Sequence, residues 1–268
     1  MLKIYIVSLK KDIERRAIIQ NILSEYNLEY EFIDAIYGKD LSEESLNLIR
    51  SKSQGKIIDR GFVPTPGEIG CTLSHIKAYQ KLINSGFDWA CILEDDAILD
   101  RRFKDFIDSF QSNHLKLEGL YLLGGQNGLD QSNVTKSIKN YQIIGKQQFF
   151  KTLKSENFIY RTCCYLVSSQ LAKKLIDLNH SSFILADDWS YLSNISLIKN
   201  IYLADFVAHP IDLSTSNIHF ERASATLQRI ANDSEVKPSF FTLLKRSLRY
   251  RSRKLMMKVY TYTEKKED

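Results

Sequence analysis

The sequence of 268 residues has few of the features that mark membrane-spanning or secreted proteins. No apolar stretch reaches the ~20 residues that a transmembrane helix needs. Residues 1–7 are mostly apolar but lead directly into the charged residues Lys10, Lys11 and Asp12, without the cleavage site of a signal peptide. We therefore expect a cytoplasmic protein whose first residues form a buried strand.

Proline and glycine are also scarce, at four and eleven residues, and no repeat or low-complexity segment is present. Most of the chain should therefore fold, and a hydrophobic fraction of 44% is sufficient for a substantial core. The four cysteines contain no CxxC pair, which argues against a zinc site and favours buried free thiols. These cysteines are Cys71, Cys91, Cys163 and Cys164.

Common catalytic and nucleotide-binding motifs are absent as well. No GxGxxG follows the first predicted strand, and no GxxxxGKS/T is present, which excludes a dinucleotide fingerprint and P-loop chemistry. Neither GxSxG nor HExxH occurs.

The basic residues are unevenly placed. Residues 245–268 contain nine basic and three acidic residues, so the whole-chain charge of +5 leaves about −1 for residues 1–244. A nucleic-acid-binding body should carry a basic face of its own. The charge distribution therefore argues against nucleic acid as a partner.

Apolar runs and helical periodicities alternate along residues 1–210, which predicts an α/β fold with a mostly parallel central sheet. We divide the chain into a catalytic domain, residues 1–238, and a C-terminal tail, residues 239–268. Strands are predicted at 3–9, 31–36, 89–93, 119–123, 160–168 and 201–204. Helices are predicted at 12–26, 42–49, 66–83 and 170–178, the third with Thr65 as N-cap and Glu68 completing a capping box.

Three adjacent acids, Glu94, Asp95 and Asp96, end the continuous apolar run 89–93. Close carboxylates at the end of a buried strand repel one another, and a bound divalent cation would remove that conflict. On an extended backbone, Glu94 and Asp96 point to one side and could share Mg²⁺ or Mn²⁺ bridging a diphosphate. Asp95 would then be left for a sugar hydroxyl or a structural bond. The alternative is a solvated acidic turn.

A second acidic pair, Asp187 and Asp188, precedes Trp189. One hypothesis is structural: one of the two acids, Asp187, simply caps the following helix. The other hypothesis is catalytic: Asp188 is the favoured base, because a carboxylate can deprotonate an acceptor hydroxyl. The indole of Trp189 would stack on the acceptor sugar.

Histidines and arginines supply the remaining candidates. His75 lies near Gly67 and Gly70, which would allow a ligand to approach closely, and His209 and His219 follow the last strand, where a metal ligand could arise. A structural or exposed role is the alternative for each histidine. Arg15 and Arg16 follow the first strand and could meet a phosphate or form a solvated helix face.

Taken in order, four segments resemble glycosyltransferase family 25, the family of bacterial lipooligosaccharide galactosyltransferases with relatives among collagen galactosyltransferases. The segments are Ile6-Val7-Ser8-Leu9, Arg15-Arg16, Thr65-Pro66-Gly67-Glu68-Ile69-Gly70-Cys71-Thr72-Leu73-Ser74-His75 and Ile92-Leu93-Glu94-Asp95-Asp96. The similarity covers roughly residues 1–222. It implies a GT-A-type nucleotide-sugar-binding fold, a UDP-sugar donor, usually UDP-galactose, and inversion at the anomeric carbon.

The resemblance also implies roles for individual residues. Glu94-Asp95-Asp96 looks like the DxD motif, with Asp96 binding Mn²⁺ or Mg²⁺, and Asp187-Asp188 resembles the pair that supplies the base. The residues expected to bind the donor are Ser8, Leu9, Arg15, Arg16, His75, Glu94 and Asp95. We expect acceptor choice to lie in residues 126–158, which match no motif.

Residues 240–262 interleave apolar and basic side chains at near-helical spacing, without an acid. Such a basic amphipathic helix can lie on an anionic membrane surface, which would place the protein on the inner face of the bacterial cytoplasmic membrane. Packing onto the catalytic domain or disorder is the alternative.

The combined hypothesis is an inverting galactosyltransferase acting on a glycolipid. Other UDP-sugars, a metal-dependent phosphohydrolase and a non-catalytic membrane-bound binding protein are its rivals.

Overall fold

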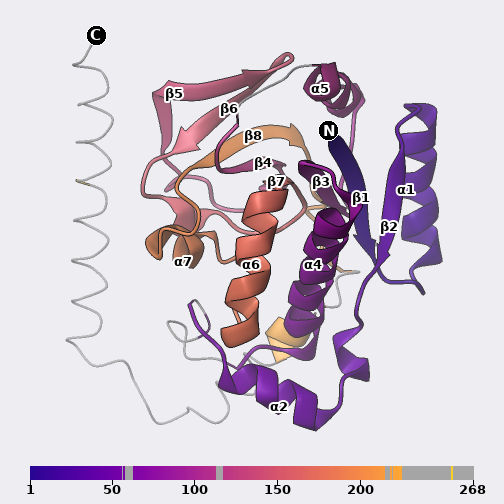
Figure 1. The fold of residues 1–268 in the computed structure, drawn as a ribbon, viewed down its shortest axis with the longest axis vertical. Coiled ribbons are helices and arrows are strands. Elements are labelled where there is room, and N and C mark those ends of the chain that lie inside the picture. Colours follow the sequence, from indigo (N-terminus) through magenta and orange to yellow (C-terminus); the bar gives the residue numbers. More distant parts are fainter. Residues whose placement is uncertain are drawn as a thin grey trace.

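The computed structural model describes residues 1–55, 57, 63–112, 117–214, 218, 220–224 and 255. Within them, eight strands form one sheet in the order β2-β1-β3-β7-β4-β8-β6-β5 (Figure 1). The strands are β1 (Leu2–Ser8), β2 (Tyr30–Asp34), β3 (Trp89–Glu94), β4 (Leu120–Gly124), β5 (Lys136–Ile144), β6 (Gln147–Thr152), β7 (Cys164–Ser168) and β8 (Ile201–Val207). The helices are α1 (Ile13–Glu25), η1 (Gly38–Asp40), α2 (Glu43–Ser51), α4 (Pro66–Ser85), α5 (Arg101–Ser112), η2 (Glu156–Phe158), α6 (Ser169–Ser181) and α7 (Trp189–Asn194).

The α/β class and the central sheet are as predicted, but the sheet is mixed rather than mostly parallel. The pairs β1–β2, β1–β3 and β4–β8 are parallel, whereas β7 runs antiparallel to both β3 and β4. The segment 126–158, which the sequence left unassigned, forms the antiparallel hairpin β5–β6 beside β8. β7 is also shorter than the predicted strand, because residues 160–163 form an irregular segment before it.

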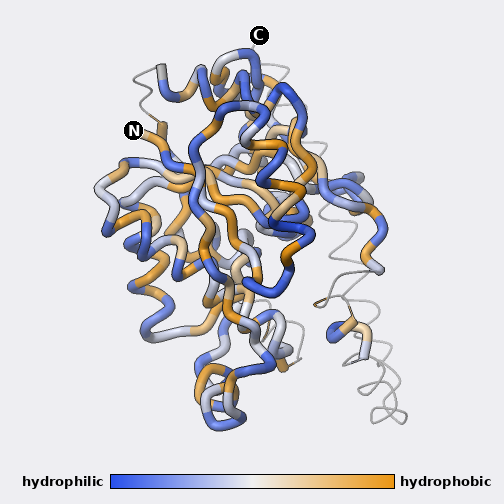
Figure 2. Tube along the Cα trace, turned by 90° about the vertical axis from the view of Figure 1, so that its right-hand side faces the viewer, coloured by the Kyte–Doolittle hydropathy of each residue, from blue (hydrophilic) through white to orange (hydrophobic). Residues whose placement is uncertain are grey.

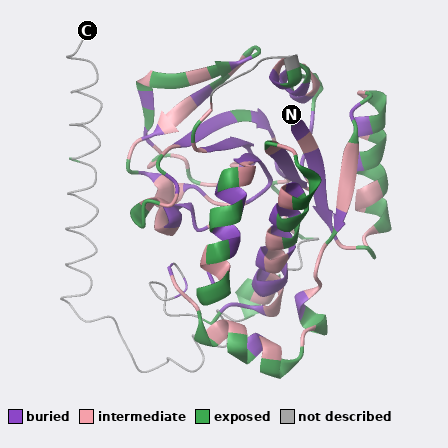
Figure 3. Ribbon diagram, in the orientation of Figure 1, coloured by how far each residue is buried: buried purple, intermediate pink, exposed green. Residues whose placement is uncertain are grey.

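Two hydrophobic cores lie on opposite faces of the sheet, because side chains alternate along each buried strand. On β3, Cys91 and Leu93 pack into one core with α1 and α5. Ala90 and Ile92 pack into the other core with α4 and α6. These two helices lie side by side in front of the sheet, with their outer faces exposed (Figures 1 and 3). Figure 2 shows the hydropathy of each residue along the chain, with hydrophobic residues in the strands and in the helices that pack on them.

Helix α4 begins as the sequence predicted. The Thr65 hydroxyl accepts from the backbone N–H of Glu68, and the Glu68 carboxylate accepts from the backbone N–H of Thr65, which completes the capping box. Gly70 permits close packing against the segment that leads into η1, because a Cβ there would lie 2.5 Å from the Ile36 carbonyl oxygen. This close approach fixes α4 beside the carboxyl ends of β1 and β2, where the candidate site lies.

The predicted domain boundary at residue 238, the tail helix and His219 fall outside the described residues, apart from Leu255. Among the residues that are described, no helix combines the length and apolar character that crossing a membrane requires.

Candidate active site

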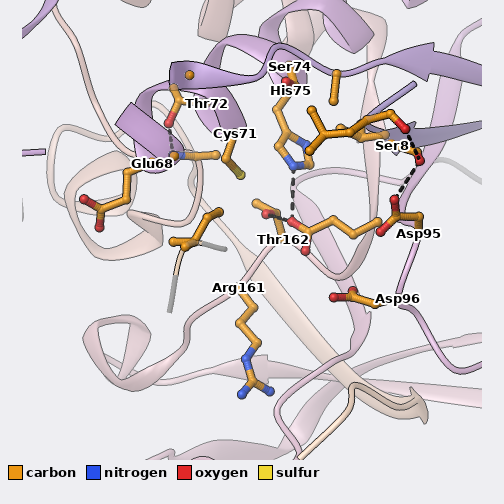
Figure 4. Close-up of a pocket in the computed structure, with 18 of the residues that line it drawn as sticks. Ser8, Glu68, Cys71, Thr72, Ser74, His75, Asp95, Asp96, Arg161 and Thr162 are labelled. Atoms are coloured by element: carbon orange, nitrogen blue, oxygen red, sulfur yellow. Dashed lines mark hydrogen bonds and ion pairs between the residues drawn. The ribbon is translucent and has the colours of Figure 1, made fainter. Parts of the chain in front are cut away.

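A cavity of about 250 Å³ opens at the edge of the sheet where β1 and β3 end and α4 begins (Figure 4). Carboxyl ends of parallel strands are the usual place for ligands in α/β folds. The polar residues that line it come from many segments: Ser8, Asp12, Arg15, Glu68, Cys71, Thr72, Ser74, His75, Glu94, Asp95, Asp96, Arg161, Thr162, Asp187, His209, Glu221 and Arg222.

The three acids after β3 have different surroundings. Asp95 accepts a 2.6 Å hydrogen bond from the Ser8 hydroxyl, and Arg15 lies 3.4 Å from both Asp95 and Asp96. Glu94 accepts from the Thr162 hydroxyl and lies 3.3 Å from His75 Nε2. Asp95 thus ties the acidic turn to β1 and α1, while Glu94 and Asp96 remain directed at the cavity.

Electrostatics separates the acids further. Burial, together with the neighbouring charges of Glu94 and Asp95, raises the pKa of Asp96 to about 7. Burial alone would also raise the pKa of Glu94, but the hydrogen bond and charge of His75 and the hydrogen bond from Thr162 outweigh it and lower that pKa. Asp96 therefore carries the unfavourable charge of the cluster, which is the charge that a cation would relieve.

Glu94, Asp96 and His209 each offer one ligand atom, and these three atoms all lie within 4.8 Å of one another. His209 Nδ1 lies 2.7 Å from the Pro210 carbonyl oxygen, so this nitrogen must donate its proton and Nε2 is left as a lone-pair acceptor. That Nε2 faces Asp96 Oδ1 at 3.9 Å, and Oδ1 is buried without a hydrogen-bond partner among the described residues. Two acceptors that face each other in this way, in a set of oxygen and nitrogen donors, fit a divalent cation.

The second acidic pair is divided between the cavity and the core. Asp187 lines the cavity and accepts a hydrogen bond from the backbone N–H of Arg161 at 3.1 Å. Asp188 is fully buried and caps α7, since its carboxylate accepts from the Tyr191 backbone N–H and the Ser190 hydroxyl. The helix cap is therefore Asp188 and not Asp187, and only Asp187 is placed to meet a ligand.

The structure also corrects the expectation for Trp189. Its side chain is fully buried in the core beside Tyr165, and its indole Nε1 donates to the Arg161 carbonyl oxygen. A buried ring cannot stack on an acceptor sugar. The residue instead helps to hold the backbone of Arg161 in place through this hydrogen bond.

Arg161 connects the two acidic groups. Its backbone has φ of 68°, which non-glycine residues rarely adopt, and in this conformation its N–H points at Asp187. Its guanidinium donates to the carbonyl oxygens of Gly125 and Asn127, and the next residue, Thr162, donates to Glu94. One short segment therefore fixes both sides of the cavity relative to each other.

Of the predicted donor residues, all but Arg16 line the cavity; they are Ser8, Leu9, Arg15, His75, Glu94 and Asp95. Arg16 instead donates to the Ser8 hydroxyl and carbonyl and pairs with Asp34 at 2.7 Å, so it supports β1 from outside the cavity.

Several cavity residues were missed from the sequence: Cys71, Thr72, Arg161, Thr162, Glu221 and Arg222. Arg161 and Thr162 were missed because an antiparallel strand presents its amino end, not its carboxyl end, at this edge of the sheet. Glu221 reaches the site over a sequence separation of 154 residues, accepting from the Gly67 backbone N–H at 2.7 Å. Arg222 likewise donates to Glu68 at 2.6 Å. No local sequence pattern predicts contacts between residues so far apart in the chain.

Comparison with known proteins identifies a family and several similar proteins. The family described as "Glycosyltransferase family 25 (LPS biosynthesis protein)" matches residues 1–190. Human procollagen galactosyltransferase 2 is 25% identical over 183 residues, covering 66% of this chain, and the chain spans only 28% of that relative's length. The lipooligosaccharide biosynthesis protein lic2B of Haemophilus influenzae is 28% identical over 175 residues, which are 64% of this chain and 61% of lic2B. A solved glycosyltransferase involved in glycosylation of the major capsid of PBCV-1 aligns over 84% of this chain and 98% of its own, with a TM-score of 0.39 and 9% identity.

Proposed function

The chain belongs to glycosyltransferase family 25, and on that premise we propose that it transfers galactose from UDP-galactose to a sugar hydroxyl of a lipooligosaccharide-type acceptor, with inversion. The observation that carries this proposal is the cavity itself, in which Asp187 and the Glu94–Asp96–His209 group line the same space. The Glu94–Asp96–His209 group suits the stabilisation of a leaving diphosphate, and Asp187 suits the role of base. An inverting transfer requires both. The choice of galactose and of the acceptor follows the names of the relatives.

The leaving-group side is formed by Glu94, Asp96 and His209, which would hold Mn²⁺ or Mg²⁺. A bound divalent cation supplies Lewis-acid stabilisation to a departing diphosphate. Arg15, 3.4 Å from Asp96, adds a fixed positive charge beside this group, and the Ser8–Asp95 hydrogen bond keeps the acidic turn against β1. The uridine and sugar of the donor would then lie along the remaining cavity wall near Leu9 and His75.

The acceptor side is formed by Asp187, which we assign as the base. Its carboxylate accepts a hydrogen bond from the Arg161 backbone N–H through Oδ2. A base must be within hydrogen-bond reach of the hydroxyl that it deprotonates, which a cavity carboxylate can achieve and the buried Asp188 cannot. Thr72 supports this position, because its hydroxyl accepts from the backbone N–H of the neighbouring Ala186 at 3.1 Å.

The left-handed backbone of Arg161 gives a prediction about this base. Arg161→Gly and Arg161→Val both remove the guanidinium, but only glycine accepts a φ of 68° without strain. A β-branched residue is a genuine outlier there, so the N–H that holds Asp187 should shift. We expect kcat at saturating substrates to be about 10²-fold lower in the valine variant than in the glycine variant, as for a misplacement of ~1 Å. Equal kcat values in the two variants would show that the left-handed backbone of residue 161 does not matter for turnover.

A donor screen tests the function directly. UDP release is measured with UDP-galactose, UDP-glucose, UDP-GlcNAc and UDP-GalNAc, with Mn²⁺ or with EDTA, and with and without a lipooligosaccharide acceptor. We expect acceptor-dependent release from UDP-galactose that EDTA abolishes. Acceptor-independent release of phosphate or UMP would instead identify a phosphohydrolase, and activity that survives EDTA would refute the metal. A binding protein would show no turnover with any donor.

We also propose that residues 240–262 bring the enzyme to anionic lipid on the inner face of the bacterial cytoplasmic membrane. Their seven basic side chains would each add about 1 kcal/mol near an anionic surface. Co-sedimentation with vesicles that contain phosphatidylglycerol should be lost when the chain ends after Pro238, and should weaken at high salt. Unchanged sedimentation of the shortened chain would exclude this role.

A further inference from the structure

Three residues of the cavity form a second cluster of possible metal ligands beside the first. Cys71 and His75 lie one turn apart on α4, and Glu94 faces them from the end of β3. Their ligand atoms, Cys71 Sγ, His75 nitrogen and a Glu94 carboxylate oxygen, all lie within 4.8 Å of one another. We propose that these residues form a binding site for a thiophilic divalent cation of the Zn²⁺ class, whose occupancy withdraws Glu94 from the leaving-group side and inhibits the enzyme.

The donor set distinguishes this site from the Glu94–Asp96–His209 group. A thiolate and an imidazole select Zn²⁺ or Cd²⁺, whereas oxygen-rich sets suit Mn²⁺ and Mg²⁺. The separation of 3.3 Å between His75 Nε2 and Glu94 Oε1 matches the ~3.4 Å expected between two ligands of a tetrahedral zinc ion. Cys71 is partly exposed to the cavity, so an ion can reach it. A fourth position would face the cavity and take water.

His75 already has the outer support that metal-bound histidines require. Its Nδ1 lies 2.8 Å from the Tyr165 hydroxyl, which lies 2.8 Å from the Tyr79 hydroxyl, all in the buried interior. In the metal-free protein, Nε2–H donates to the Glu94 carboxylate, and Nδ1 pairs with the Tyr165 hydroxyl. When a cation takes the Nε2 lone pair, the ring proton must reside on Nδ1 and be donated to Tyr165. Hydroxyls can reverse their roles, so this pair of tyrosines supports either tautomer.

Binding is balanced in protons and charge. The Cys71 thiol proton leaves to solvent as the S–metal bond forms. The metal-bound imidazole of His75 keeps one ring proton, on Nδ1, and any second ring proton also leaves to solvent. No oxidant or reductant takes part. Because both clusters need Glu94, occupancy of one competes with occupancy of the other. This consequence for activity rests on the proposed transferase function, whereas the binding of the cation does not.

The other three cysteines provide matched controls. Cys91 and Cys164 face each other at 3.8 Å in the core on the opposite side of the sheet, and Cys163 Sγ donates to the Ala208 carbonyl oxygen. Within the described part of the chain, none of these three belongs to a cluster of ligands that could hold an ion. Cys163 is the closest control, since it immediately precedes β7 and follows the cavity residue Thr162.

Titration of the metal-free full-length chain with Cd²⁺ tests the site, because a cadmium–thiolate bond gives an ultraviolet charge-transfer band. We expect one equivalent of Cd²⁺ to produce this band in the wild type and in Cys163→Ser, and Zn²⁺ to displace it. Cys71→Ser should lose the band. His75→Gln should keep it, with at least tenfold weaker affinity, which gives a second test if the serine variant folds poorly. A band that persists in Cys71→Ser, or a wild type without a band, would overturn the site.

Inhibition is measured separately, as UDP release at increasing Zn²⁺ and fixed Mn²⁺. We expect Zn²⁺ to raise the Mn²⁺ concentration needed for half-maximal rate at least tenfold in the wild type, and substantially less in Cys71→Ser. An equal effect in both would overturn the inhibitory role. A further outcome is that the Cd²⁺ band changes in the variants as expected while no donor is turned over by the wild type. In that case the proposed function is refuted and the cation site is supported.

Discussion

Replacing Asp96 with asparagine should lower kcat/KM by about 10³-fold or more and weaken Mn²⁺ binding at the Glu94–Asp96–His209 group. The variant keeps the shape of the side chain but removes one of the charges that would hold the cation, and electrostatic stabilisation of a leaving group is commonly worth this much. Mn²⁺ affinity is measured by electron paramagnetic resonance without donor, and turnover by UDP release. Mn²⁺ affinity and turnover should both decrease in this variant.

The matched control is Asp100→Asn, an exposed acid on the same connection that pairs with Arg102 at 2.7 Å. It should leave Mn²⁺ affinity and turnover near wild-type values. Metal-dependent turnover of Asp96→Asn at the wild-type rate would contradict the assignment of Asp96.

The raised pKa of Asp96 adds a pH dependence with a definite sign. In the metal-free fold the pKa rises from 3.8 to about 7, because burial and the charges of Glu94 and Asp95 disfavour ionisation. A cation must displace that proton, so Mn²⁺ affinity should fall about tenfold per pH unit below 7 and level off above it. Without metal, the same shift means that the fold loses stability as pH rises from about 4 to 7, and Asp96→Asn should remove this loss.

Asp187→Asn should reduce kcat by about 10² to 10⁴-fold, the usual contribution of a general base, while the thermal midpoint and donor affinity stay close to wild type. Asparagine still accepts the Arg161 N–H at the same position, so the local structure is kept and only basicity is lost. Stopped assays at saturating acceptor separate kcat from KM. A variant that retains full kcat would exclude Asp187 as the base.

Asp188→Ala is the companion variant with the opposite expected behaviour. Loss of its cap on α7 should lower the free energy of unfolding by about 1 kcal/mol or more, since the cap is buried. Turnover by the folded fraction should stay within a few-fold of wild type. Loss of turnover with unchanged stability would restore Asp188 as the base.

The local parts of the fold were predictable because short segments carry enough information. The apolar runs that became β1 and β3, and the capping box that starts α4, depend on neighbouring residues only. The hairpin β5–β6 was not predicted, because its strands mix exposed and buried positions without strict alternation. The direction of the strands was likewise not predicted from the sequence, and the antiparallel β7 is the clearest case.

The acidic cluster Glu94-Asp95-Asp96 was recognised from the sequence alone, since three adjacent acids after a buried run are a local conflict of charge and burial. The partners of that cluster were decided only by tertiary structure. The reversed direction of β7 brings Arg161 and Thr162 to the cavity, and the end of β8 brings His209 opposite Asp96. The proximity of Cys71 on α4 to Glu94 at the end of β3 was likewise decided by the tertiary structure. A carboxylate's neighbours across a cavity depend on how strands are ordered and directed, and that order is set by packing across the whole sheet rather than by any local pattern.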